Sequence, residues 1–141
     1  DLMNHGDTKL WIIQVGTGFA LFFLGSVHLY IMLTNPGNIG PYASSDRVYS
    51  DLMWPLYIML LAAVEFHGAI GLYRLSVKWG WFEGDDPKKS RKRLKKAKWI
   101  LSAVMLTLGV ATLLAYMKIG AEHQANYGER YIPQVEVQNA N

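Results

Sequence analysis

The chain has 141 residues, of which 51% are hydrophobic and 18% charged, and its formal net charge is +3. It contains no cysteine, which excludes disulfides and thiolate-held iron–sulfur clusters, so any electron transfer would need another cofactor. The length predicts a single domain over residues 1–141, and the start at Asp1, close to an apolar segment, suggests part of a longer chain.

The apolar residues are concentrated in three segments, at residues 10–34, 52–75 and 99–117. A helix needs about 20 mostly apolar residues to cross the core of a bilayer. The first and third segments contain no ionised side chain, and the first is too long for the apolar region of a signal peptide. A chain this small has too little interior to bury three such helices. The sequence therefore predicts an all-α fold, a transmembrane bundle with three spanning helices.

Turn and cap residues mark the boundaries of these helices. The stretch NPGNIGP, residues 35–41, is expected to end the first helix. Asp51 is the expected N-cap of the second helix, and Pro55 falls in its first turn. The stretch GDDPKKS, residues 84–90, predicts a turn before a short basic helical segment that leads into the third span.

Small residues recur every four positions in the third span. This spacing predicts a face for close contact with another helix. The residues are Ala103, Thr107 and Ala111.

Ten of the 14 Lys and Arg residues lie between positions 74 and 98. The positive-inside rule therefore places the 76–98 connection and the N-terminus in the cytoplasm, and the 35–51 loop and the 118–141 tail outside. A nucleic-acid site is disfavoured because the basic stretch is tied between two spans. Tryptophans near the span ends fit an interfacial aromatic belt. They are Trp11, Trp54, Trp79, Trp81 and Trp99.

Two histidines, His28 and His67, lie inside apolar segments. A histidine inside a membrane helix is costly and is a functional hypothesis by default. Hydrogen bonding between helices is one interpretation. The other is ligation of haem iron, because small neighbours such as Gly25 and Gly71 leave room for a flat ring beside each imidazole. Zinc is disfavoured because no third or fourth ligand of the usual kind is at hand.

The depths of the two histidines predict two separate haems. His28 lies roughly 9 Å below the outer end of its helix, and His67 lies roughly 20 Å past Trp54 on the antiparallel helix. An offset of about 10 Å is too large for both to bind opposite sides of one iron. One haem is therefore expected near the outer face and one near the cytoplasm. His5 and His123 fall outside the spans and are expected to be solvated.

Polar residues near His67 extend this hypothesis. Arg74 and Lys78 return to the histidine's face of the helix and point to the cytoplasm, where haem propionates would emerge. Snorkelling of basic residues at a helix end explains each of them alone about as well. Trp11 lies at comparable depth and has one N–H to donate. Glu65 points to the other side, where it is either a proton-transfer site or a polar helix contact.

Two long stretches carry a family resemblance. They are DLMNHGDTKLWIIQVGTGFALFFLGSVHLYIMLT, residues 1–34, and MWPLYIMLLAAVEFHGAIGLYRLSVKWGWF, residues 53–82. With the order of the spans, they resemble the cytochrome b subunit of dihaem fumarate reductases from epsilonproteobacteria. The likeness runs over nearly the whole chain and weakens after Met117.

The resemblance implies a five-helix fold with two haems b, each held by two histidines, of which this chain is similar to the last three helices. His28 matches a ligand of the distal haem iron and His67 a ligand of the proximal one. Trp11 and Lys78 match positions near the proximal propionates. Glu65 matches a glutamate implicated in transmembrane proton movement. The first two helices, with the partner histidines, would precede this chain.

The function implied by the resemblance is that of a haem-carrying anchor in the bacterial inner membrane. It would pass electrons from menaquinol to the iron–sulfur and flavoprotein subunits of a fumarate reductase or succinate dehydrogenase. The chain would then be no enzyme on its own, with membrane lipid as a further partner and a homodimer of the complex left open. The alternative is a haem-free structural anchor, or a transporter segment whose histidines are helix-packing groups.

Overall fold

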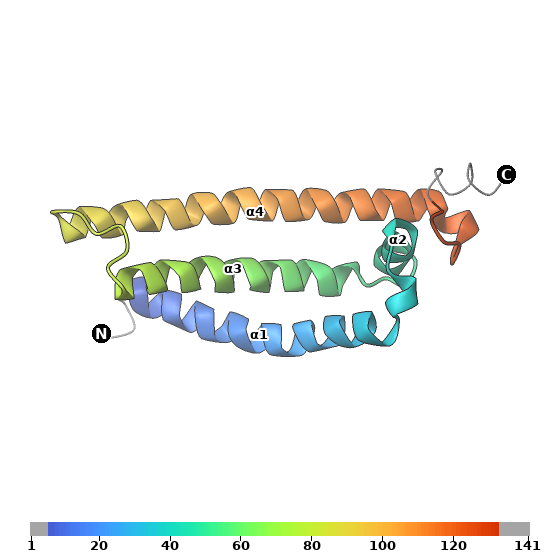
Figure 1. The fold of residues 1–141 in the computed structure, drawn as a ribbon, viewed down its shortest axis with the longest axis horizontal. Coiled ribbons are helices and arrows are strands. Elements are labelled where there is room, and N and C mark those ends of the chain that lie inside the picture. The colour runs from blue at the N-terminus through green and yellow to red at the C-terminus, as the bar shows by residue number, and fades with distance from the viewer. Residues whose placement is uncertain (1–5, 133–141) are drawn as a thin grey trace.

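The computed structural model describes residues 6–132, which form helices and connecting turns without a strand in that range (Figure 1). The α-helices are α1 (Gly6–Thr34), α2 (Pro41–Tyr49), α3 (Trp54–Lys78) and α4 (Pro87–His123). There are also two short 3₁₀ turns: η2 (Pro36–Asn38) connects α1 to α2, and η3 (Gln124–Asn126) follows α4. The long helix α3 lies between α1 and α4, and α2 packs against α4 at one end of the bundle. The predicted all-α fold is confirmed.

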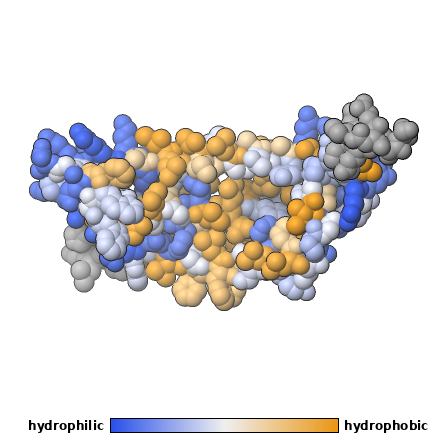
Figure 2. Space-filling model, viewed as in Figure 1, coloured by the Kyte–Doolittle hydropathy of each residue, from blue (hydrophilic) through white to orange (hydrophobic). Residues whose placement is uncertain are grey.

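The helices α1, α3 and α4 are long and apolar enough to cross a membrane. Figure 2 shows an apolar band across the middle of the molecule with hydrophilic ends on both sides. Many large apolar side chains of the long helices are exposed, and Phe22 and Leu33 of α1, for example, are 69% and 77% exposed. Exposing such a continuous apolar surface to water is unfavourable. Lipid or further helices would cover it.

The cytoplasm-facing end predicted from the charges contains a small buried core and two well-formed helix ends. Leu10, Ile70 and Tyr73 pack together there. At the end of α3, Gly80 adopts a φ of +65° and the Trp81 N–H donates to the Ser76 carbonyl at 2.9 Å, as in a Schellman motif. This cap turns the chain sharply toward α4.

The start of α4 follows from its sequence. Pro87 occupies the first turn, and the Asp86 carboxylate accepts hydrogen bonds from the backbone N–H groups of Lys88 and Lys89 at 3.0 and 3.2 Å. The helix then continues without a break to His123, beyond both ends of the apolar segment at residues 99–117. The basic segment is therefore the first part of the same helix.

The connection at residues 35–51 is more structured than a loop, because it contains η2 and α2. The expected capping role of Asp51 is wrong. α3 begins at Trp54 after Met53, and no side chain caps it. Leu52 has a φ of +54° and redirects the chain, so that the Asp51 carboxylate instead accepts a hydrogen bond from the Tyr127 hydroxyl at 2.8 Å.

The expected small-residue face of the third span is also wrong for contacts within this chain, since Ala103, Thr107 and Ala111 are exposed. The close approach of α3 and α4 lies at Gly109 instead, where a Cβ would meet the terminal methyl groups of Leu61. Gly109 is two residues from Thr107, or about 200° around the helix, so the two positions face different surroundings.

Candidate functional site

The imidazole of His67 lies between α3 and α1. Its Nδ1 is 3.0 Å from the backbone carbonyl oxygen of Gln14 and 3.4 Å from the Thr17 hydroxyl. Gly18 makes room for the ring, because a Cβ there would lie 3.2 Å from the His67 Cε1. A carbonyl oxygen only accepts, so Nδ1 carries the proton and Nε2 keeps a lone pair. This arrangement is typical of histidines that bind metals through Nε2.

His28 lies on α1, half-buried, with its ring edge-on to Tyr57 of α3 at a centroid distance of 5.6 Å. Its Nδ1 is buried and has no hydrogen-bond partner among the described residues. The ring borders a cavity of about 370 Å³ that all four α-helices line, with Gly109 and Thr112 on the α4 side. An unpaired buried nitrogen beside a cavity is uncommon and marks a candidate ligand site.

The two histidines lie at different levels of the bundle. His67 contacts α1 at Gly18, ten residues before His28, and His28 contacts α3 at Tyr57, ten residues before His67. Ten residues of α-helix span about 15 Å. This separation is larger than the offset expected from the sequence, and it supports two sites over one shared iron.

Arg74, Lys78 and Val77 line a second cavity, of about 180 Å³, at the end of α3. The Arg74 guanidinium donates to the side-chain oxygen of Gln14 at 2.5 Å, which links it to the residue that holds His67. The Lys78 ammonium lies 5.6 Å from the Trp79 ring centroid. The structure thus places Lys78 beside Arg74.

Trp11 and Glu65 are less closely tied to the histidines. Trp11 lies one turn before Gln14 on α1 and is 49% exposed. Glu65 is half-buried, one turn beyond Leu61 on the side of α3 that meets α4. Among the described residues it makes no ion pair, which leaves its carboxyl available for either of the expected roles.

Arg47 and Gln14 were not found by reading the sequence. Arg47 is only 9% exposed, borders the His28 cavity, and donates from its guanidinium to the Asn38 carbonyl at 2.9 Å. Within residues 6–132 no carboxylate pairs with it. Its position as the single Arg of the outer loop was the available signal. Gln14 contacts His67 through its backbone carbonyl, which every residue type has, so the sequence could not single it out.

Residues 2–112 of the chain match the family described as succinate dehydrogenase/fumarate reductase transmembrane subunit. The match covers well over half of the chain. The chain belongs to this family.

Two relatives of this transmembrane subunit family show high identity. The protein named fumarate reductase cytochrome b subunit in Wolinella succinogenes is 62% identical over 122 residues, which are 86% of this chain and 48% of that protein. The protein of the same name in Helicobacter pylori is 54% identical over 125 residues, 89% of this chain and 48% of that protein. The chain therefore spans about half the length of these relatives.

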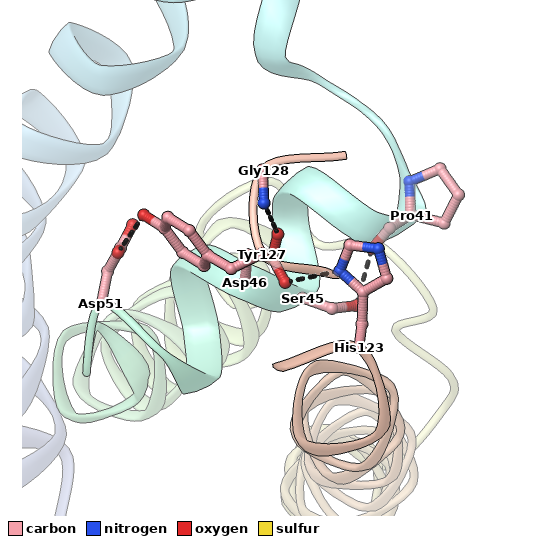
Figure 3. A network of polar contacts seen from close by, with 7 residues as sticks. All are labelled: Pro41, Ser45, Asp46, Asp51, His123, Tyr127 and Gly128. Atoms are coloured by element: carbon pink, nitrogen blue, oxygen red, sulfur yellow. Dashed lines mark hydrogen bonds and ion pairs between the residues drawn. The ribbon is translucent and has the colours of Figure 1, made fainter. Parts of the chain in front are cut away.

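One end of this transmembrane subunit contains a polar network that corrects the expectation for His123 (Figure 3). His123 is buried, not solvated, and its Nδ1 lies 2.9 Å from a carboxylate oxygen of Asp46. The other oxygen of Asp46 accepts the Gly128 N–H at 3.0 Å, and the Tyr42 ring stacks on the imidazole. The burial of His123 could not be predicted from the sequence because its partner, Asp46, is 77 positions away. His5 lies outside the described residues.

Tyr127 connects the segment after α4 to the chain just before α3, at the same end of the bundle. Its hydroxyl donates to Asp51 near the start of α3. This hydrogen bond, with the charge of Asp51, raises the pKa of the Tyr127 phenol from its usual value of 10.0. The phenol therefore keeps its proton, and with it the hydrogen bond, over the ordinary range of pH.

Proposed function

We propose that the chain is part of a haem-carrying membrane anchor that passes electrons from menaquinol to the iron–sulfur and flavoprotein subunits of a fumarate reductase or succinate dehydrogenase. The observation that carries the proposal is the setting of His67, whose Nδ1 is held by the Gln14 carbonyl so that Nε2 is left for a metal. Membership of the transmembrane subunit family and the cytochrome b in the relatives' names agree with it.

The residues present fit two haem groups. The ring of His67 is seated against α1 at Gly18 with its Nδ1 held by Gln14, so that Nε2 is left for iron. His28 borders a cavity, and its Nδ1 is unpaired among the described residues. Haem supplies one-electron redox chemistry when it is bound. We assign His67 to the proximal haem iron and His28 to the distal one. The second ligand of each would come from a part of the full-length protein outside this chain, as the length of the relatives allows.

Charged side chains near each histidine suit the propionates of these groups. Lys78, with Trp11 as a hydrogen-bond donor, would hold the proximal propionates, because the cavity at Lys78 opens at the basic end of the bundle. Arg47 places a buried cation at the cavity of His28. We further propose that Glu65 is a proton-transfer site between α3 and α4, since its carboxyl is half-buried and makes no ion pair among the described residues.

The charge distribution supports a definite orientation in the bacterial inner membrane. The basic first turns of α4 would face the cytoplasm together with the N-terminal end of α1, and α2 would face outward. The iron–sulfur and flavoprotein subunits would then bind at the end that carries Lys78. Menaquinol would be oxidised elsewhere in the full-length protein or at a site this chain shares.

A reduced-minus-oxidised absorption spectrum of the full-length protein tests the proposal. Haem iron held by two imidazoles gives a sharp α-band, and we expect this band in the purified protein. We also expect two haems per full-length protein. The alternative, a haem-free anchor or transporter segment with histidines as packing groups, predicts no such band. A folded protein without haem after expression in a host that makes haem would overturn the proposal.

Lys78→Met is expected to lower the midpoint potential of the inner haem. A cation near the propionates favours the added electron, and methionine keeps the length of the side chain but removes the charge. Because Lys78 is exposed, water screens much of its field, so the drop should stay below about 60 mV, the one-electron equivalent of a tenfold change.

A redox titration of both haems measures the effect of Lys78→Met. Lys89→Met is the matched control, since Lys89 is exposed at the same end but forms a surface pair with Asp86 instead of lining the cavity. Equal shifts in both haems, or no shift in either, would show that Lys78 is an ordinary interfacial lysine.

A further inference from the structure

The short helix α2 forms the outer wall of the His28 cavity. Ser44, Arg47 and Val48 of α2 line the cavity together with His28 itself. α2 has nine residues, and an isolated helix of that length is marginal in water. Its position over the cavity must therefore come from contacts with the rest of the chain.

The strongest of these contacts joins α2 to the last turn of α4. The side chains of Asp46 and His123 are 5% and 7% exposed, and the imidazole Nδ1 donates to the carboxylate at 2.9 Å. The second carboxylate oxygen receives the Gly128 N–H, so that both oxygens of Asp46 are occupied. Figure 3 shows His123 and Gly128 converging on Asp46 from the chain that ends α4. A buried carboxylate with both oxygens bonded fixes its helix in rotation as well as position.

Asp46 and Arg47 are neighbours in sequence and lie about 100° apart around α2. While Asp46 faces α4, Arg47 faces η2 and the cavity, where its guanidinium reaches the Asn38 carbonyl and the sulfur of Met32. A rotation of α2 about its axis would therefore move the Arg47 cation away from the cavity.

We propose that Asp46 and His123 are positioning residues, whose buried contact holds α2 so that the Arg47 guanidinium stays at the outer wall of the His28 cavity. The structural part stands on the contacts alone. The consequence for redox chemistry rests on the proposed function, because it requires that a haem is bound at His28.

The structural part is tested by thiol labelling in the full-length protein. Ser44→Cys places a thiol on the cavity wall, and this chain has no cysteine of its own. His123→Leu removes the donor, whereas His123→Asn keeps an N–H near the position of Nδ1. A membrane-impermeant maleimide added outside should label Ser44→Cys roughly tenfold faster in His123→Leu, the effect of removing one partner of a buried hydrogen bond, and at nearly the original rate in His123→Asn.

The control is Tyr127→Phe, which removes the exposed hydrogen bond to Asp51 in the same segment and should leave the labelling rate unchanged. If His123→Leu does not fold, Asp46→Asn is the milder variant, since it replaces one of the two acceptor oxygens with a donor, and it should also speed labelling. Equal rates in all variants, or equal acceleration by His123→Asn, would each overturn the proposal.

The midpoint potential of the outer haem tests the role of Arg47. His123→Leu should lower this potential and leave that of the inner haem unchanged, while His123→Asn restores it. Faster labelling with an unchanged outer potential would overturn the positioning of Arg47. Because labelling needs no haem, failure of the proposed function would appear in the spectrum and leave the labelling result intact.

Discussion

His67→Ala and His28→Ala in the full-length protein are each expected to remove mainly one of the two haems. The two imidazoles lie about 15 Å apart along the bundle, so the loss of one ligand leaves the other site in place. His67→Ala should remove the inner haem and His28→Ala the outer one. The haem-to-protein ratio from pyridine haemochrome assays, with redox titration of the remaining haem, measures both effects.

A matched control separates ligand loss from general damage. Thr17→Val keeps the shape of a side chain that lies 3.4 Å from His67 Nδ1 but removes its hydroxyl. The Gln14 carbonyl still holds the imidazole in this variant, so both haems should remain. If either alanine variant loses both haems while its helix content by circular dichroism is unchanged, the assignment of one haem to each histidine is wrong.

Gly120→Ala should destabilise the outer end of the bundle. A Cβ on Gly120 would lie 2.5 Å from the Ser45 carbonyl oxygen and 2.6 Å from the Tyr49 Cβ, so the backbone of α2 would have to move. Overpacking of this kind costs roughly 1–3 kcal/mol. Alanine in place of glycine returns at most about 1 kcal/mol of helix propensity. The net effect should lower the thermal unfolding midpoint.

Two comparisons make the Gly120 result specific. Ala121→Ser adds an atom at the exposed neighbouring position and should change the midpoint little. Gly109→Ala meets only the flexible end of the Leu61 side chain, which can rotate, so its cost should be smaller than that of Gly120→Ala. Thermal denaturation of the purified full-length protein in detergent gives all three midpoints. A Gly120→Ala protein as stable as the original would contradict the close packing of α2 on α4.

The sequence was enough for the three membrane helices and for some of their ends because these depend on local composition, whereas the cap expected at Asp51 and the end expected at Met117 were wrong. An apolar segment of some 20 residues has to be a helix in lipid, where every backbone polar group must be paired within the segment. Pro36 after α1, Gly80 after α3 and Asp86 before α4 each act on adjacent backbone. The placement of His28 and His67 at separate levels followed from counting residues along such helices, although the offset was underestimated.

The faces of the helices were decided only by the tertiary structure. In lipid, the surface that meets another helix is no more apolar than the surface that meets acyl chains, so hydrophobic periodicity does not reveal it. Within this chain, the contact face of α4 therefore contains Gly109 and Gly120 and not the evenly spaced Ala103 and Thr107.

The polar contacts of the candidate sites likewise needed the folded chain. His67 depends on a backbone carbonyl 53 positions away, and His123 on a carboxylate 77 positions away. Arg47 is buried because α2, a helix inside an expected loop, packs across the end of the bundle. The energy of each contact arises when distant segments exclude water together, and no property of either segment alone specifies that pairing.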